Sequence, residues 1–129
     1  MFDKLVLAMS DKTVLVTGGA GFIGSHLVEY LLEKDYYVIS LDNFFSGSVR
    51  NVEKFRGHPR FETIRHDIID KMRLEVDEIY HLACPASPVH YQKDPVYTLQ
   101  TCFTGTSNIL DLAKRTNARV VFVSTSEVY

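Results

Sequence analysis

A glycine-rich stretch, residues 17–26, constrains the fold of this chain more than any other segment. It directly follows an apolar run at 13–16 and opens an amphipathic run at 22–34, so its context is strand, turn and helix. Glycines in such a turn permit a tight bend, close approach of a pyrophosphate and packing of the helix against the strand. They are Gly18, Gly21 and Gly24. Because the first N–H groups of the helix face the bend, the motif predicts an anion-binding turn of the dinucleotide type, with a purely structural turn as the alternative.

The rest of the chain alternates predicted strands with predicted helices. Nearly continuous apolar runs are typical of buried parallel strands, and the predicted strands are residues 13–17, 37–41, 61–65, 78–83 and 120–123. A long helix is predicted from Asp94-Pro95 to about Thr116, ended by Asn117, with apolar residues at three- and four-residue spacing. Residues 44–59 are predicted as a loop and a short charged helix. This alternation predicts an α/β fold with a doubly wound parallel sheet, forming a single Rossmann-like domain over residues 1–129.

Acidic residues follow two of the predicted strands. Asp42 ends the second strand, close to the ~20 residues beyond the glycines where an acid holds the ribose hydroxyls of NAD. A surface aspartate at a strand end is the alternative interpretation. His66, Asp67 and Ile68 follow the third strand, at the edge where ligands of open α/β sheets collect. The sequence therefore predicts an NAD site, NAD being favoured over NADP by the carboxylate of Asp42.

Composition excludes several other classes of protein. The net charge of −2 gives no bulk attraction to nucleic acid, and no apolar run approaches the ~20 residues that a membrane span needs. The two cysteines, Cys84 and Cys102, form no CxxC motif, so we expect no disulfide framework and a reducing, cytoplasmic compartment. They are predicted to be small core residues, with a pair of redox partners as the alternative interpretation. The histidines show no spacing typical of metal ligands, so no metal is expected.

With these residues laid out, the chain resembles the extended short-chain dehydrogenase/reductase family, and within it the UDP-glucuronate decarboxylases. The segments that carry the resemblance are residues 17–26, 42–47, 65–67, 80–88 and 124–129. The first is shared by many sugar-nucleotide enzymes. The paired phenylalanines at 44–45, the proline-flanked loop at 84–88 and the Thr-Ser-Glu-Val-Tyr ending are more particular to the decarboxylases.

The resemblance implies a reaction in which NAD is regenerated. C4 of the glucuronate ring is oxidised, the resulting β-keto acid loses carbon dioxide, and hydride returns to give UDP-xylose. The implied catalytic residues are Thr125, which would hydrogen-bond the reacting hydroxyl, with Ser126 and Glu127 near C4 and the carboxylate. The implied substrate-binding residues are Asn108, Lys114 and Arg115. The implied cofactor-binding residues are Gly18, Gly21, Phe22, Ile23, Gly24, Asp42, Asn43, Phe45, Ser46, Gly47, Asp67, Ile68, Leu82, Cys84 and Thr101.

The chain departs from the family pattern in places. Gln100 stands where the family usually has lysine, Cys102 where it has asparagine, and Asp111 where it has glycine. The family's catalytic tyrosine and lysine are expected beyond Tyr129, so the resemblance covers the amino-terminal half of such an enzyme, truncated after the fifth strand, and we expect this half alone to be inactive.

The sequence leaves three alternative functions and one possible protein partner open. The alternatives are a dehydratase, an epimerase of the same fold, and a non-catalytic NAD-binding module. The resemblance also implies a possible homodimer through helix 95–116.

Overall fold

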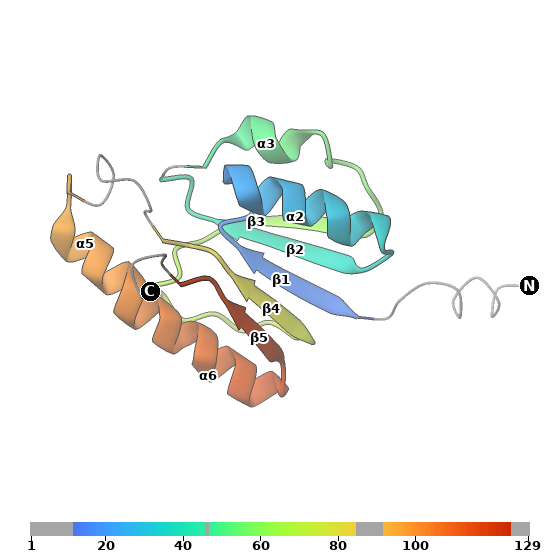
Figure 1. The fold of residues 1–129 in the computed structure, drawn as a ribbon. Helices are drawn as coiled ribbons and strands as arrows, with labels where there is room; N and C mark the ends of the chain where they lie inside the picture. Colours follow the sequence, from blue (N-terminus) through green and yellow to red (C-terminus); the bar gives the residue numbers. More distant parts are fainter. Residues whose placement is uncertain (1–11, 46, 85–91, 125–129) are drawn as a thin grey trace, which may run out of the picture.

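The computed structural model describes residues 12–45, 47–84 and 92–124, and in this part of the chain the strands form one parallel sheet (Figure 1). The strand order is β3-β2-β1-β4-β5. The chain therefore builds outward from β1 in one direction and then crosses to its other side with β4, which creates a topological switch point between β1 and β4. The strands are β1 (Thr13–Thr17), β2 (Tyr37–Asp42), β3 (Phe61–Arg65), β4 (Glu78–His81) and β5 (Arg119–Phe122).

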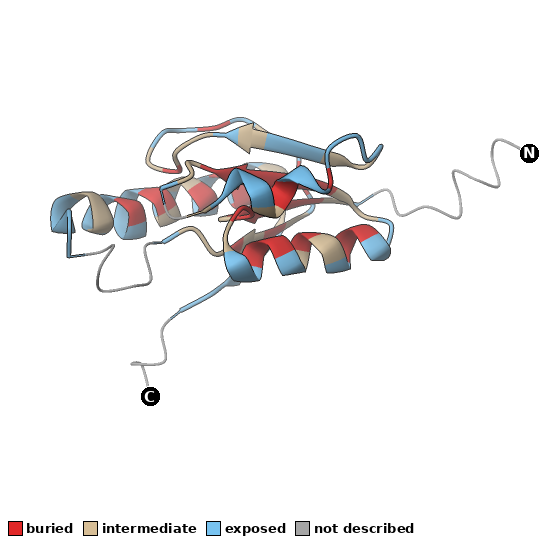
Figure 2. Ribbon diagram, turned by 90° about the horizontal axis from the view of Figure 1, so that it is seen from above, coloured by how far each residue is buried: buried red, intermediate tan, exposed pale blue. Residues whose placement is uncertain are grey.

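Helices cover both faces of this sheet (Figures 1 and 2). On one face, α2 (Phe22–Glu33) packs through Val28 and Leu31 on the valines of β1, with α3 (Val49–Glu53) alongside. On the other face lie α5 (Pro95–Gln100), the π-helical turn η1 (Thr101–Gly105) and α6 (Thr106–Thr116). The prediction of a doubly wound parallel sheet is therefore confirmed.

The long helix begins and ends where its capping residues predict. The Asp94 side chain accepts a hydrogen bond of 3.0 Å from the Tyr97 N–H, and Pro95 occupies the first turn. Asn117 follows the last turn in the left-handed conformation, with a φ of 57°. The π-helical turn η1 within this helix was not predicted. At its end, a Cβ on Gly105 would lie only 2.5 Å from Cδ1 of Ile68, so glycine lets the helix pack directly on that side chain.

The long helix has two different apolar faces. Ile109, Leu112 and Ala113 are buried against the sheet. A second set of apolar residues is exposed: Val96, Leu99, Phe103 and Leu110. The apolar spacing that predicts the helix thus runs mainly along its exposed side.

Two features are absent from the described ranges. No helix there combines the length and the apolar character required to cross a membrane. No group of three or more histidine, cysteine, aspartate or glutamate side chains in those ranges could hold a metal ion.

Candidate functional site

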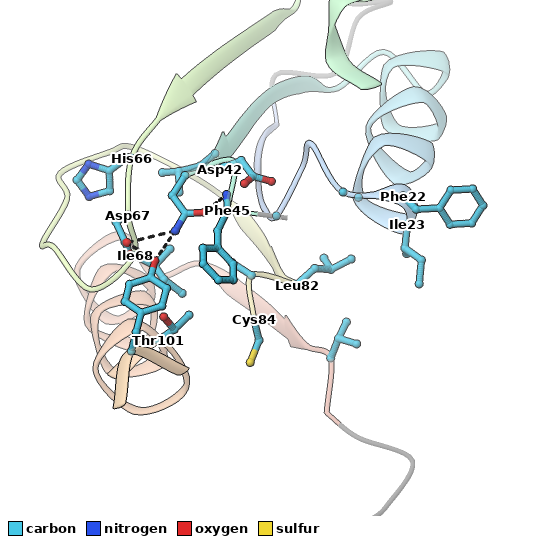
Figure 3. A pocket seen from close by; sticks show the side chains of 18 residues that line it. Phe22, Ile23, Asp42, Phe45, His66, Asp67, Ile68, Leu82, Cys84 and Thr101 are labelled. Carbon is cyan, nitrogen blue, oxygen red and sulfur yellow. Dashed lines mark hydrogen bonds between the residues drawn. The ribbon is translucent and has the colours of Figure 1, made fainter. Parts of the chain in front are cut away.

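A cavity of about 400 Å³ lies at the carboxyl ends of β1, β2 and β4, beside the switch point of the sheet (Figure 3). This is the edge where open α/β sheets bind their ligands, and the volume falls in the range of small-molecule sites. The cavity is lined by Gly18, Gly21, Phe22, Ile23, Gly24, Leu41, Asp42, Asn43, Phe45, His66, Asp67, Ile68, Leu82, Ala83, Cys84, Tyr97, Thr101 and Val123.

The glycine-rich turn forms one wall of the cavity. Gly18 has a φ of +74°, a conformation that favours glycine, and its carbonyl accepts a hydrogen bond of 3.0 Å from the Gly21 N–H. A Cβ on Gly24 would lie 2.0 Å from that same carbonyl oxygen, so only glycine fits there. The N-cap residue of α2 is Gly21, which has no side chain to cap the helix. Its first N–H groups are therefore available to an anion, as the sequence motif predicts.

Asp42 is fixed at the floor of the cavity by the backbone around it. Its side chain is only 8% exposed. One carboxylate oxygen, Oδ2, accepts a hydrogen bond of 3.0 Å from the Ala20 N–H in the glycine-rich turn. The other, Oδ1, accepts one of 2.7 Å from the Phe44 N–H. A carboxylate held in this way keeps lone pairs for further donors, so Asp42 is oriented to accept hydrogen bonds from ligand hydroxyls.

A polar cluster of Asn43, Asp67 and Tyr97 joins three segments at another wall (Figure 3). Tyr97 donates its phenolic proton to Oδ2 of Asp67, and Asn43 Nδ2 donates to both of these partners. The Phe45 ring packs against Tyr97, with 5.6 Å between the ring centroids. Burial, together with the hydrogen bond to the Asp67 carboxylate, raises the pKa of Tyr97 to about 12. Tyr97 therefore remains a proton donor over the whole physiological range of pH.

We expect Tyr97→Phe to lower the free energy of unfolding by about 1 kcal/mol, because it removes a donor to a half-buried carboxylate. Chemical denaturation would measure the change. Tyr30→Phe, on a ring that is more than half exposed, is the matched control and is expected to leave stability unchanged. Equal stability of the Tyr97 variant and the unmodified chain would contradict the assigned role.

A buried histidine network supports the cavity from behind. Thr17 Oγ1 accepts hydrogen bonds of 3.1 Å from the N–H groups of both Leu82 and Ala83, which occupy its two lone pairs. The Thr17 hydroxyl proton must therefore point to Nδ1 of His81, 2.7 Å away. This places the proton of the neutral imidazole on Nε2, which donates to Thr106 Oγ1 at 3.0 Å. The network ties β1, β4 and α6 together, and burial lowers the pKa of His81 to about 4.

Thr101 and Cys84 complete the lining on the helix side of the cavity. The Thr101 side chain is only 4% exposed, and its hydroxyl has no hydrogen-bond partner of ordinary geometry among the described residues. A buried hydroxyl of this kind at a cavity wall suits a polar ligand. Cys84 and Cys102 are both exposed, so the prediction that they are small core residues is wrong. They are exposed because Cys84 follows the end of β4 and Cys102 lies on the solvent-facing side of η1.

The structure brings most of the predicted cofactor-binding residues together. All of them line the cavity except Gly47, which lies behind Asp42, and Ser46, which falls outside the described residues. The predicted catalytic residues Thr125, Ser126 and Glu127 also fall outside the described residues. His66, which the sequence places at the ligand-binding edge, also lines the cavity. Sequence reasoning assigned no role to four further residues of the lining: Leu41, Ala83, Tyr97 and Val123.

The three predicted substrate-binding residues lie on α6, outside the cavity lining. Asn108 donates a hydrogen bond of 2.8 Å to the Ile68 carbonyl. Arg115 donates to the Met72 carbonyl at 3.1 Å and pairs with Asp111. Lys114 is exposed. Asn108 and Arg115 thus bind the segment that follows β3, and Arg115 also pairs within α6. The contact of Asn108, Lys114 and Arg115 with a sugar nucleotide stays a prediction.

The fold and the cavity together define a Rossmann-type α/β domain, in which the glycine-rich turn, the acid at the end of β2 and the switch point occupy their usual places. The chain belongs to the family described as GDP-mannose 4,6 dehydratase, whose sequence profile matches residues 15–129.

Individual relatives refine this assignment. UDP-glucuronic acid decarboxylase 5 of Arabidopsis thaliana is 56% identical over 93% of this chain and 36% of its own length, which confirms the resemblance to the decarboxylases. Among solved structures, a dTDP-glucose 4,6-dehydratase from Streptomyces venezuelae with NAD bound has a TM-score of 0.80 and 35% identity, over 90% of this chain and 40% of that one. A UDP-glucose 4-epimerase from Thermus thermophilus in complex with NAD has a TM-score of 0.72 and 35% identity, over 88% and 37%. The chain thus spans between 27% and 36% of the length of such decarboxylases.

Proposed function

We propose that this chain supplies the NAD-binding part of an enzyme that converts UDP-glucuronate to UDP-xylose. The observation that carries the proposal is the cavity, whose lining unites the glycine-rich turn, the fixed carboxylate of Asp42 and the Asn43–Asp67–Tyr97 cluster. The choice of substrate is supported by identity, which is 56% to a decarboxylase but 35% to a dehydratase and to an epimerase of the same fold.

The cavity offers suitable contacts for each part of an NAD molecule: pyrophosphate, ribose, adenine and nicotinamide. The pyrophosphate would face the uncapped amino end of α2, where the first N–H groups donate. The hydroxyls of the adenosine ribose would donate to Asp42, and the adenine would lie against Ile68 near Asp67. Thr101, whose buried hydroxyl makes no hydrogen bond of ordinary geometry within the described part of the chain, would serve the nicotinamide half.

Bound NAD would supply a hydride acceptor for C4 of the glucuronate ring and a hydride donor after carbon dioxide has left. The proposed work of the protein is to hold and move protons at the same carbon. Thr125 would hydrogen-bond the C4 oxygen as it changes from hydroxyl to ketone, with Ser126 nearby. Glu127 would exchange a proton beside it, a role worth about 10²–10⁴ in rate for a positioned acid or base.

A chimeric enzyme tests this function. Residues 12–129 would replace the matching residues of the Arabidopsis decarboxylase, and the product would be analysed after incubation with NAD and UDP-glucuronate. We expect carbon dioxide and UDP-xylose in equal amounts. An epimer, or an unchanged sugar nucleotide, from a chimera that folds and binds NAD would contradict the proposal. The epimer would favour the epimerase alternative.

The exposed face of the long helix supports the proposed homodimer. Phe103 is 75% exposed, and Val96, Leu99 and Leu110 lie at helical spacing from it. We expect Phe103→Asp to weaken self-association at least tenfold, because it places a charge at the centre of an apolar contact. Sedimentation equilibrium would measure the dimer dissociation constant.

The matched control for this prediction is Val49→Asp. Val49 is 48% exposed and lies on α3, on the opposite face of the sheet (Figure 1). This control should leave the dissociation constant unchanged. If the unmodified chain is a monomer at all concentrations tested, or if both variants behave alike, helix 95–116 is not the dimer face.

A further inference from the structure

Two cysteine side chains meet at the wall of the cavity. Cys84 follows the end of β4, and Cys102 lies in η1, eighteen residues further along the chain. Their sulfur atoms are 2.8 Å apart. A disulfide bond is about 2.05 Å long, so a shift of less than ~1 Å would bring the two sulfur atoms to bonding distance. The fold therefore already aligns the two thiols.

Both thiols are open to small molecules. Each cysteine is exposed, and Cys84 also lines the cavity, which is wide enough for a small-molecule ligand (Figure 3). Burial and the hydrogen bond with Cys102 raise the pKa of Cys84 to about 12.

We propose that Cys84 and Cys102 form an intramolecular disulfide by exchange with a small-molecule disulfide such as oxidised glutathione. In the first step one of the two cysteine thiols gives up its proton and attacks one glutathione sulfur, which forms a mixed disulfide and releases one glutathione thiolate. In the second, the other cysteine gives up its proton and attacks the protein sulfur of that mixed disulfide, and the second glutathione leaves. The two protein thiols are oxidised, one glutathione disulfide is reduced to two thiols, and two protons move from the protein to the glutathione.

The cross-link would join the end of β4 to the helix that covers the sheet. It closes a loop between residues 84 and 102, and a closed loop restricts the unfolded chain. Thr101, next to Cys102, lines the cavity beside Cys84, so the bond would tie two walls of the site together. The oxidised chain should therefore unfold at a higher temperature than the reduced chain, and a dithiol reductant should reverse the difference.

The test incubates the purified chain with oxidised glutathione and follows it by intact mass and thiol titration. We expect the unmodified chain to lose two hydrogen atoms and both thiols, while it stays monomeric on a denaturing gel without reductant. Cys84→Ser and Cys102→Ser should each stop at a glutathione adduct, because neither variant keeps the second thiol that would displace the glutathione.

Other outcomes overturn the inference. A stable glutathione adduct on the unmodified chain, a disulfide between two chains, or two thiols that persist after prolonged incubation would each show that the pair does not bond within one chain. None of these readouts depends on NAD binding or turnover, so the proposed function can fail separately.

Discussion

Lowering the pH from 7 to 4 is expected to reduce the free energy of unfolding by about 3 kcal/mol through His81 alone. The side chain is 4% exposed, and burial holds its pKa near 4, well below the 6.5 of a histidine in water. An added proton would have to sit on Nδ1, where it would face Thr17 Oγ1, whose lone pairs already accept two backbone N–H groups. The folded chain therefore has no good place for a charged imidazole.

The direction of this pH effect follows from the difference in proton binding between the folded and the unfolded chain. Between pH 6.5 and 4 the unfolded chain binds a proton at this histidine and the folded chain does not, so unfolding is favoured as the pH falls. The contribution is fully present above pH 6.5 and is lost by about pH 4. Carboxylates also titrate in acid, so the histidine must be separated from them by substitution.

Urea denaturation of His81→Gln at pH 7 and pH 4 provides that separation. The variant should be less stable at pH 7, because glutamine cannot serve both threonines, but its stability should fall with pH by about 3 kcal/mol less than that of the unmodified chain. Parallel pH profiles for His81→Gln and the unmodified chain would rule out a buried neutral imidazole.

Strand positions were largely predictable because buried parallel strands are continuous apolar runs. β1 and β3 match their predicted ranges, and β2 extends one residue further. β4 ends at His81, two residues before its predicted end. The reason is local: beyond His81 the N–H of Ala83 is taken by the Thr17 hydroxyl and no longer pairs in the sheet. The pattern of apolar residues cannot indicate this hydrogen bond, because the Thr17 hydroxyl lies sixty-six residues earlier in the sequence.

The cavity was predictable where a backbone requirement fixes the residue type. Gly18 must adopt a positive φ, and Gly24 must leave room for the Gly18 carbonyl, so the sequence pattern alone indicates both positions. Tyr97 was missed because its role depends on a tertiary contact with Asp67, thirty residues earlier in the chain. The pairing of Cys84 with Cys102 is of the same kind, since it needs the register of the long helix against β4. Side chains that act across elements are the part that a single sequence does not reveal.

Replacing Asp42 by alanine is expected to weaken NAD binding by about 1–3 kcal/mol, or roughly 5- to 150-fold, because the ribose hydroxyls would lose a charged acceptor. The carboxylate is held by the N–H groups of Ala20 and Phe44 and does not have to be ordered when a ligand binds. The same fixed charge would repel a 2′-phosphate. Unmodified protein should therefore bind NADP more weakly than NAD.

Calorimetric titration of the two nucleotides measures both effects. The control is Asp111→Ala, which removes the same charge from an exposed ion pair on α6 and should leave NAD affinity unchanged. Asp42→Ala also removes two buried hydrogen bonds, so its melting curve must show a folded chain before its affinity is interpreted. If that variant does not fold, the comparison of NAD with NADP on the unmodified chain still tests the assignment. Two results would contradict the assignment: tighter binding of NADP than of NAD, or undiminished NAD affinity in a folded Asp42→Ala variant. The ribose would then lie elsewhere, and the Asp42 carboxylate would only stabilise the glycine-rich turn through its hydrogen bond with the Ala20 N–H.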